Sequence, residues 1–204
     1  MSGPTPARWV FLRHGESAAN AAGVVSGWDD VPLTAVGEDQ ARSAGVALAA
    51  GEPLRHAVTS DLRRAHRTAT GALAALTEAG GPAPPLHVEG RLRERNLGRW
   101  QGRAYAHLRE TGESETLVSW SDRPPGGESN ADLAWRVLGA LADLEDRLGP
   151  GATLVVAHGG VIRAVLGLLD GVPRDALAKA HIPNARPLAR AVAPGTWAAL
   201  MRGL

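Results

Sequence analysis

The sequence predicts an α/β protein built as a three-layer α/β/α sandwich around a mostly parallel central sheet. Two observations support this prediction. Short apolar runs of strand length alternate with longer stretches whose apolar residues have helical spacing. Two of the apolar runs lead into a His-Gly pair, as expected where strands deliver side chains to one edge of a parallel sheet. The chain has no internal repeat and no linker, so we expect one domain over residues 1–204, with a lid-like insertion at about 99–128.

Apolar runs bounded by turn-forming residues predict the strands. In chain order they lie at 9–12, 57–59, 86–88, 153–157 and 188–192. The run at 153–157 is the most apolar, which is typical of a strand buried on both faces of a parallel sheet. It follows a Gly-Pro-Gly turn at 149–151, which separates it from the preceding helical stretch.

Amphipathic stretches with capping residues predict the helices. They run from a cap at Thr34 to about Gly51, from a cap at Ser60 or Asp61 towards Leu76, from Glu128 to Leu148, and from after His158 to Leu169. Residues 91–127 are less regular and rich in glycine, which is typical of a lid or binding loop. We expect Trp100, Trp120 and Trp135 to pack beneath this lid.

The composition excludes several classes of function. The chain has 22 Lys and Arg residues against 21 Asp and Glu, so no nucleic-acid or membrane partner is expected. It has no cysteine, which excludes disulfides, thiolate metal sites and cysteine nucleophiles. The segment from Met1 to Arg8 lacks the order of a signal peptide, and no apolar stretch is long enough to span a membrane. A cytoplasmic location is therefore expected.

The residues that carry chemistry follow the predicted strands. Arg13-His14-Gly15 follows the first strand, and His158-Gly159-Gly160 follows the most apolar one. Parallel strands would bring both histidines to the same edge of the sheet. Taken alone, Arg13 and His14 could simply begin a solvated loop, and His158 could be a buried core histidine. Because the same pattern occurs twice, we favour the functional interpretation.

Two further groups lie on segments that can reach that edge. Arg64 lies near the start of a predicted helix, where the backbone favours anions. Its neighbours Arg63 and Arg67 are expected to form a solvated face instead. Glu94 lies among several arginines, where a carboxylate is usually an ion-pair partner.

Six short motifs occur in a recognisable order between Val10 and about Asn184. They are Arg13-His14-Gly15-Glu16-Ser17 with Asn20, Gly27-Trp28-x-Asp30 with Leu33-Thr34, Ser60-x-Leu62-x-Arg64-Ala65, Leu92-x-Glu94 with Gly98-x-Trp100-x-Gly102, Gly126-Gly127-Glu128-Ser129, and His158-Gly159-Gly160-x-x-Arg163. Each motif is only moderately specific, but together and in this order they are very specific. The chain resembles the histidine phosphatase superfamily, in its phosphoglycerate mutase-like branch.

The resemblance implies a role for each core residue. His14 would be the nucleophile that becomes phosphorylated, with Arg13, Arg64 and a protonated His158 around the phosphoryl group. Glu94 would donate a proton to the leaving oxygen and later take one from the attacking water. Asn20, Ser26 and Gly27 resemble additional phosphate or substrate contacts.

The chemistry is consistent with these roles. Nearby cations should lower the pKa of His14, which keeps its attacking nitrogen unprotonated. Guanidinium groups can stabilise the charge of a transferring phosphoryl group without a metal. No metal is expected, because His14, Glu16, Glu94 and His158 lack the local spacing of metal-ligand motifs.

The branch contains both phosphatases and mutases. Mutases of this type carry a longer insertion with an Arg-Arg pair and a Lys, whereas residues 105–125 here are short and have only Arg109 and Arg123 as Lys or Arg residues. We therefore expect a phosphomonoester phosphatase without a cofactor. The alternative is a phosphoglycerate mutase that depends on 2,3-bisphosphoglycerate, and a less favoured third interpretation is a catalytically weak phospho-ligand or protein-interaction module.

The sequence leaves the substrate open within one class. The expected partner is a small-molecule phosphate ester, with phosphoglycerate derivatives, sugar phosphates and nucleotide-like phosphates such as α-ribazole phosphate as candidates. The oligomeric state is also open, with a homodimer as one alternative.

Overall fold

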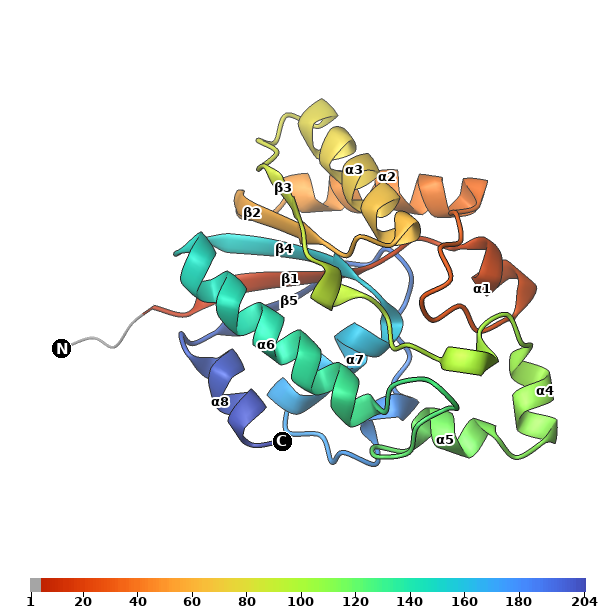
Figure 1. Cartoon of the computed structure of the whole chain (residues 1–204). Helices are drawn as coiled ribbons and strands as arrows, with labels where there is room; N and C mark the ends of the chain where they lie inside the picture. Colours follow the sequence, from red (N-terminus) through yellow and green to blue (C-terminus); the bar gives the residue numbers. More distant parts are fainter. Residues whose placement is uncertain (1–4) are drawn as a thin grey trace.

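The computed structural model describes residues 5–204 and has the expected α/β sandwich (Figure 1). Five strands form one sheet in the order β3-β2-β4-β1-β5. They are β1 (Ala7–Arg13), β2 (Leu54–Thr59), β3 (Leu86–Val88), β4 (Ala152–Ala157) and β5 (Leu188–Val192). Neighbours among β1 to β4 run parallel, while β5 pairs antiparallel with β1 at one edge. The prediction of a mostly parallel sheet is therefore confirmed.

Helices cover both faces of the sheet (Figure 1). α2 (Ala35–Ala49) and α3 (Arg63–Glu78) lie on one face. α6 (Asn130–Leu148), α7 (Gly159–Leu169) and α8 (Thr196–Arg202) lie on the other. Three short helices lie beyond the carboxyl ends of the strands, namely α1 (Ala18–Ala22), α4 (Tyr105–Glu110) and α5 (Ser114–Val118).

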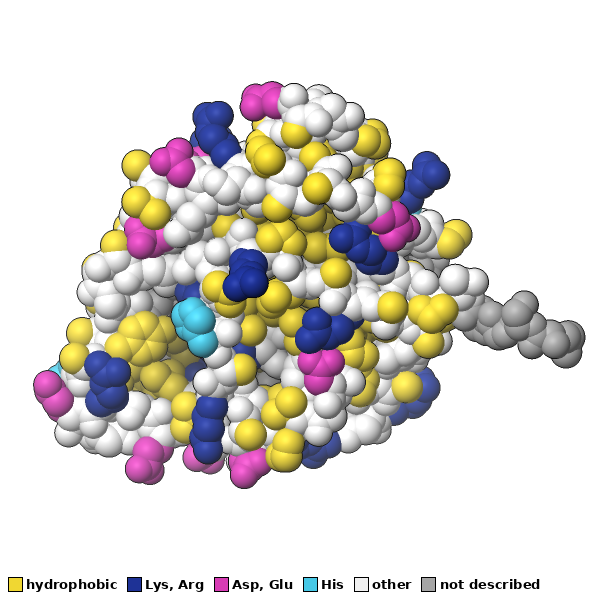
Figure 2. Space-filling model, turned by 180° about the vertical axis from the view of Figure 1, so that it is seen from behind, with side chains coloured by type: hydrophobic (Ala, Val, Ile, Leu, Met, Phe, Trp, Pro, Cys, Tyr) yellow, Lys and Arg dark blue, Asp and Glu magenta, His cyan; other side chains and the backbone are white. Residues whose placement is uncertain are grey.

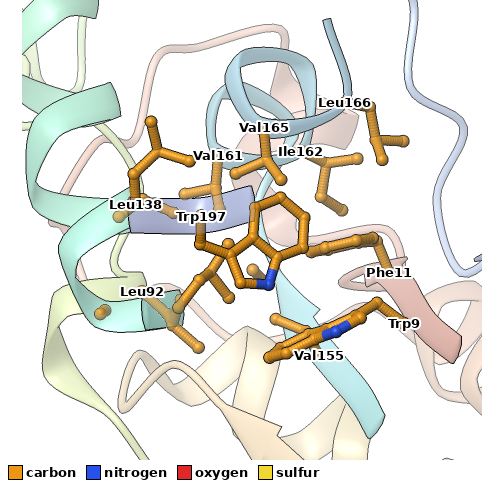
Figure 3. Close-up of a cluster of buried hydrophobic side chains, with 14 of the residues drawn as sticks. Trp9, Phe11, Leu92, Leu138, Val155, Val161, Ile162, Val165, Leu166 and Trp197 are labelled. Carbon is orange, nitrogen blue, oxygen red and sulfur yellow. The ribbon is translucent and has the colours of Figure 1, made fainter. Parts of the chain in front are cut away.

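The alternation of side chains along β1 explains this layering. Val10 and Leu12 belong to the core beneath α2 and α3, whereas Trp9 and Phe11 belong to the core beneath α6, α7 and α8. Successive strand residues point to opposite faces, so a continuous apolar run serves two cores. In the larger core, Trp197 of α8 packs edge-on against Trp9 and Phe11, with ring centroids 5.3 and 6.1 Å away (Figure 3). The sequence analysis did not predict α8.

The register of the parallel strands brings the two histidines together. Arg13 on β1 is the partner of Ala157 on β4, so His14 and His158 are each the first residue after paired strand ends. The backbone N–H of His14 then donates to the carbonyl of Ala157 over 2.9 Å. Their ring centroids lie 5.3 Å apart.

The segment expected to be a lid is more ordered than its glycine content indicates. Besides α4 and α5 it holds the 3-10 helix η2 (Gly98–Trp100) at its start, and a further 3-10 helix, η1 (Gly90–Leu92), precedes it. Val25, Leu97, Trp100 and Leu108 form a small third core in this region. The burial expected for Trp100 is confirmed, but the expectation for Trp135 is wrong, because this residue faces outward from α6 and is 57% exposed. Trp120 is half-buried, with the Arg174 guanidinium 5.6 Å from its ring.

Two helix starts differ from the prediction. The N-cap of α3 is Leu62, which makes no side-chain cap hydrogen bond, whereas Ser60 and Asp61 precede the cap. α6 begins at Asn130 rather than at Glu128, and its N-cap Ser129 forms a capping box with Asp132. By contrast, Thr34 caps α2 as expected, because its hydroxyl accepts the N–H of Gly37 over 3.1 Å.

On the face opposite to that of Figure 1, both signs of charge occur among the described residues. Figure 2 shows Lys and Arg side chains interspersed with Asp and Glu there. Among residues 5–204, none of the helices is long and apolar enough to cross a membrane.

Candidate active site

A cavity of about 550 Å³ opens at the carboxyl edge of the sheet. Its lining includes seven of the eight residues expected at the site, which are Arg13, His14, Asn20, Ser26, Gly27, Arg64 and Glu94. The eighth, His158, is fully buried and does not line the cavity itself. The volume falls in the range of ordinary small-molecule sites and exceeds the space that a phosphate group needs.

His14 is held in one orientation by its own turn. Its Nδ1 lies 2.7 Å from the carbonyl oxygen of Gly15. Because a carbonyl can only accept, Nδ1 carries the ring proton and Nε2 keeps its lone pair. Burial lowers the pKa of His14 well below its ordinary value, and the charges of Arg64 and Arg13 lower it further. The ring is therefore neutral and nucleophilic at neutral pH.

Glycines allow the turn that carries His14 to lie against the start of α2. A Cβ on Gly15 would lie 2.2 Å from the carbonyl oxygen of Gly37, and a Cβ on Gly37 would lie 2.1 Å from that of Glu16. The N–H of Gly15 also donates to the hydroxyl of Thr68 on α3 over 2.9 Å. Both helices of this face thus hold the backbone of the turn that carries His14.

Arg64 is fully buried and is held by two loop carbonyls. Its Nη1 donates to Asp29 over 2.9 Å, and its Nη2 donates to Gly27 over 2.8 Å. Its Nε is buried and has no hydrogen-bond partner among the described residues. Burial lowers the pKa of Arg64, but a guanidinium stays charged in proteins.

Like Arg64, Arg13 and His158 each have a buried side-chain nitrogen without a hydrogen-bond partner among the described residues. Arg13 donates from Nη1 to the carbonyl of Ile182 over 2.7 Å, and its Nε is buried without a partner within residues 5–204. His158 Nε2 lies 3.0 Å from the Ser60 hydroxyl, while its Nδ1 is buried and likewise unpartnered. The hydroxyl oxygen of Ser60 also accepts the N–H of Leu62 over 3.2 Å. Burial without a partner costs a polar group roughly 1–3 kcal/mol, so these nitrogens fit a site that is completed by an anion.

The charge of His158 differs from the expectation. Burial lowers its pKa well below the ordinary value, and the neighbouring Arg64 charge adds to this. His158 is therefore neutral in the free protein. The negative charge of a bound anion would favour its protonated form.

Glu94 is held by two backbone N–H groups. Its Oε1 accepts from Arg95 over 2.8 Å, and its Oε2 accepts from Gly160, in the first turn of α7, over 3.0 Å. A Cβ on Gly160 would lie only 2.2 Å from Glu94 Oε1. The second glycine of the His-Gly-Gly motif thus provides room for the carboxyl group. Glu94 makes none of the described ion pairs, although a carboxylate among several arginines is usually an ion-pair partner.

The three residues expected as additional contacts also lie in the cavity wall. Asn20 uses its carbonyl oxygen locally, because it accepts from the N–H of Ser17 over 3.2 Å. Ser26 lines the same wall. Gly27 has a φ of 47°, and a Cβ there would lie 2.5 Å from the side-chain oxygen of Gln101. The carbonyl of Gly27 accepts a hydrogen bond from Arg64, so Gly27 both lines the cavity and holds the Arg64 side chain.

The sequence analysis missed much of the outer cavity wall. The residues it did not assign to the site include Arg95, Leu97, Tyr105, Arg109, Asn130 and Arg163. Arg95 is 5% exposed and donates from Nη2 to the carbonyl of Leu117 over 3.0 Å. Only Arg163 carried a local signal, since it follows His-Gly-Gly at a fixed spacing. Within residues 5–204, no group of three or more His, Cys, Asp or Glu residues is arranged to hold a metal ion.

Comparison with known proteins agrees with this geometry. A family model of the histidine phosphatase superfamily (branch 1) matches residues 9–201. The chain is 37% identical over 179 residues to a glucosyl-3-phosphoglycerate phosphatase of Mycolicibacterium vanbaalenii, covering 82% of this chain and 76% of that protein. It is 35% identical over 208 residues to a 2,3-bisphosphoglycerate-dependent phosphoglycerate mutase of Bifidobacterium longum, covering 88% and 83% respectively.

Solved structures give the same result. A mycobacterial glucosyl-3-phosphoglycerate phosphatase in complex with VO3 superposes with a TM-score of 0.77 at 31% identity, covering 90% of each chain. A putative α-ribazole-5′-phosphate phosphatase of Escherichia coli superposes with a TM-score of 0.76 at 26% identity, covering 92% of this chain and 96% of that one. The chain belongs to the histidine phosphatase superfamily, branch 1.

Proposed function

We propose that this protein is a phosphomonoester phosphatase that works through a phosphohistidine on His14 Nε2. The observation that carries the proposal is the neutral His14 ring, with Nδ1 bound to a carbonyl, beside three unpartnered buried nitrogens. Those nitrogens belong to Arg13, Arg64 and His158. Such an arrangement suits a phosphoryl group, whose transfer depends mainly on positioning and on charge stabilisation.

In the first step, His14 Nε2 attacks phosphorus and the bond to the ester oxygen breaks. Glu94 gives its proton to the leaving oxygen, so an alcohol departs. The guanidinium groups of Arg13 and Arg64 stabilise the transferring oxygens, and the incoming dianion favours a protonated His158. Asn20, Ser26 and Gly27 form the wall beside the phosphate.

In the second step, water attacks the phosphohistidine while the ionised Glu94 takes one of its protons. The N–P bond breaks, phosphate leaves, and His14 and Glu94 return to their starting states. The mechanism needs no cofactor. A small phosphate ester is the proposed substrate, and phosphoglycerate derivatives are the first class to test because both curated relatives above are named for them.

The direct test is phosphate release from p-nitrophenyl phosphate with a chelator present. We expect steady release by the wild-type protein and none by His14→Ala. Release by His14→Ala at the wild-type rate would refute the assignment of the nucleophile. A protein that binds phosphate esters but releases no phosphate would support a weak phospho-ligand or interaction module instead.

A mutase is the second candidate. Its support is the matched mutase of Bifidobacterium longum together with Arg95, Arg109 and Arg163, which add positive charge to the outer cavity wall. A mutase would interconvert 3- and 2-phosphoglycerate after priming with bisphosphate. Interconversion much faster than phosphate release would favour this alternative over the phosphatase.

A further inference from the structure

We propose that Arg136 on α6 is a positioning residue for the proton donor Glu94, acting together with Glu128 and Trp28. This inference rests on the proposed function, since it concerns how the donor is held. We call the three residues the donor clamp. None of them lines the cavity, so any effect on catalysis has to pass through the backbone segments that they contact.

The segment 91–96 needs hydrogen bonds from outside itself. It begins in η1 and continues through residues 93–96, which lie outside the helices and strands and so lack regular backbone partners. Arg136 donates from Nη1 to the carbonyls of Arg91 and Arg93, over 2.7 and 3.0 Å. It also donates from Nη2 to the carbonyl of Glu94 itself, over 3.2 Å. One guanidinium therefore holds three backbone carbonyls, one of Glu94 itself and two within the three residues before it.

Glu128 fixes the orientation of that guanidinium. Its two oxygens accept from Nε and Nη2 of Arg136 over 2.8 and 2.7 Å, which is a bidentate pair. Both side chains are largely buried, with exposures of 17% and 20%. Glu128 Oε2 also accepts the N–H of Asn96 over 2.9 Å. The clamp thus holds the segment on both sides of Glu94.

Trp28 completes the clamp from the opposite loop. Its indole Nε1 donates to the carbonyl of Glu94 over 2.7 Å. The guanidinium groups of Arg93 and Arg136 lie 4.9 and 5.9 Å from its ring centroid, within the range of cation–π attraction. Trp28 directly follows Gly27, whose carbonyl holds Arg64. The clamp therefore links segment 91–96 to the loop that positions Arg64.

The clamp should influence proton transfer more than phosphate binding. General acids act across roughly 2.6–3.2 Å, so a small displacement of the Glu94 backbone weakens proton delivery. Phenyl phosphate has a poor leaving group that needs this proton, whereas the p-nitrophenolate leaving group needs it far less. A merely structural role would affect both esters equally.

The test compares Arg136→Gln with Arg147→Gln, an exposed position in the last turn of the same helix that loses the same charge. For Arg136→Gln we expect kcat on phenyl phosphate to fall roughly tenfold or more, because a misplacement of about 1 Å can cost about a hundredfold. We expect kcat on p-nitrophenyl phosphate to change less than threefold, with KM little changed on both esters. Arg136→Lys should not restore activity, since an ammonium lacks the planar fork. Arg147→Gln should behave as wild type.

Trp28→Phe gives a second measurement if Arg136→Gln does not fold. It removes the indole N–H but keeps an aromatic ring, and should show the same dependence on the leaving group with a smaller loss. Equal losses on both esters, or no loss, in the folded clamp variants would overturn the inference. Glu94→Gln separates the two proposals: if it shows the dependence on the leaving group and the clamp variants do not, only the clamp fails. If Glu94→Gln also loses both activities equally, the donor role fails.

Discussion

Replacing Gly160 by alanine tests whether the position of Glu94 controls turnover. Gly160 lies in the first turn of α7, and its φ is not in the left-handed region, so alanine can adopt the backbone. The new Cβ would lie 2.2 Å from Glu94 Oε1 and 3.1 Å from its carboxyl carbon. The substitution therefore pushes on the proposed proton donor without removing any catalytic group.

The magnitude follows from these distances. Comfortable van der Waals separation begins at about 3.5 Å, so the carboxyl group has to move by roughly 1 Å. Such a displacement also breaks the hydrogen bond from the Gly160 N–H to Glu94 Oε2. A misplacement of this size costs about a hundredfold in rate, or about 2.7 kcal/mol in activation free energy. We expect that loss in kcat for phenyl phosphate and a loss below about fivefold for p-nitrophenyl phosphate, because general acid catalysis matters less for a good leaving group.

The assay is steady-state phosphate release by Gly160→Ala with both esters, next to thermal unfolding. Gly139→Ala on α6 is the matched control, because its Cβ would meet only the flexible Met201 sulfur, at 3.5 Å. Replacing glycine by alanine within a helix stabilises the folded protein by about 0.5–1 kcal/mol where there is space for the new methyl group. The control should therefore be active and at least as stable as wild type. In the double variant with Glu94→Gln, Gly160→Ala should cause little further loss, since both changes act on one group. A folded Gly160→Ala protein that turns over phenyl phosphate within threefold of wild type would refute this reasoning.

Three further predictions concern the turn that carries His14, the proposed phosphate site and pH. Gly37→Ala should destabilise the fold and lower the melting temperature, because its Cβ would lie 2.1 Å from the Glu16 carbonyl; an unchanged melting temperature would contradict the close packing of these loops. Arg64→Lys should lower kcat/KM roughly tenfold or more, since lysine cannot donate to two carbonyls and a phosphate together in the planar geometry of arginine; initial rates at low substrate concentration measure this, and a change below threefold would contradict the role. His14 and His158 have pKa values well below the ordinary 6.5, so unfolding takes up protons below pH 6.5. The free energy of unfolding should then fall between pH 6.5 and 5, by up to about 2.7 kcal/mol per pH unit for two protons. Urea unfolding measures this slope, which His158→Gln should roughly halve, and a flat profile would contradict two neutral buried histidines.

Local patterns in the sequence were sufficient to predict several residues that lie near His14. The apolar runs before His14 and His158 define strands, and parallel pairing places both residues at one edge. Thr34 caps its helix through a hydrogen bond to a residue three positions later, which is a local interaction. The positions of Arg13, Arg64 and Glu94 in the cavity wall also agree with the motif order.

Other features depended on contacts between distant segments. The exposure of Trp135 depends on which face of α6 packs on the sheet, and its residue type alone indicated burial. Arg95 reaches the cavity because a carbonyl 22 residues later holds its side chain.

The sequence by itself determined the fold class, the family motifs and the residues that meet at the strand ends, because strand alternation, helix capping and motif spacing act over a few residues. Only the tertiary structure decided the neutral state of His158, the room that Gly160 leaves for Glu94 and the hydrogen bonds from Arg136 to the donor segment. Burial and hydrogen bonding of this kind arise between segments that are far apart in the chain, and no local pattern encodes which of them meet.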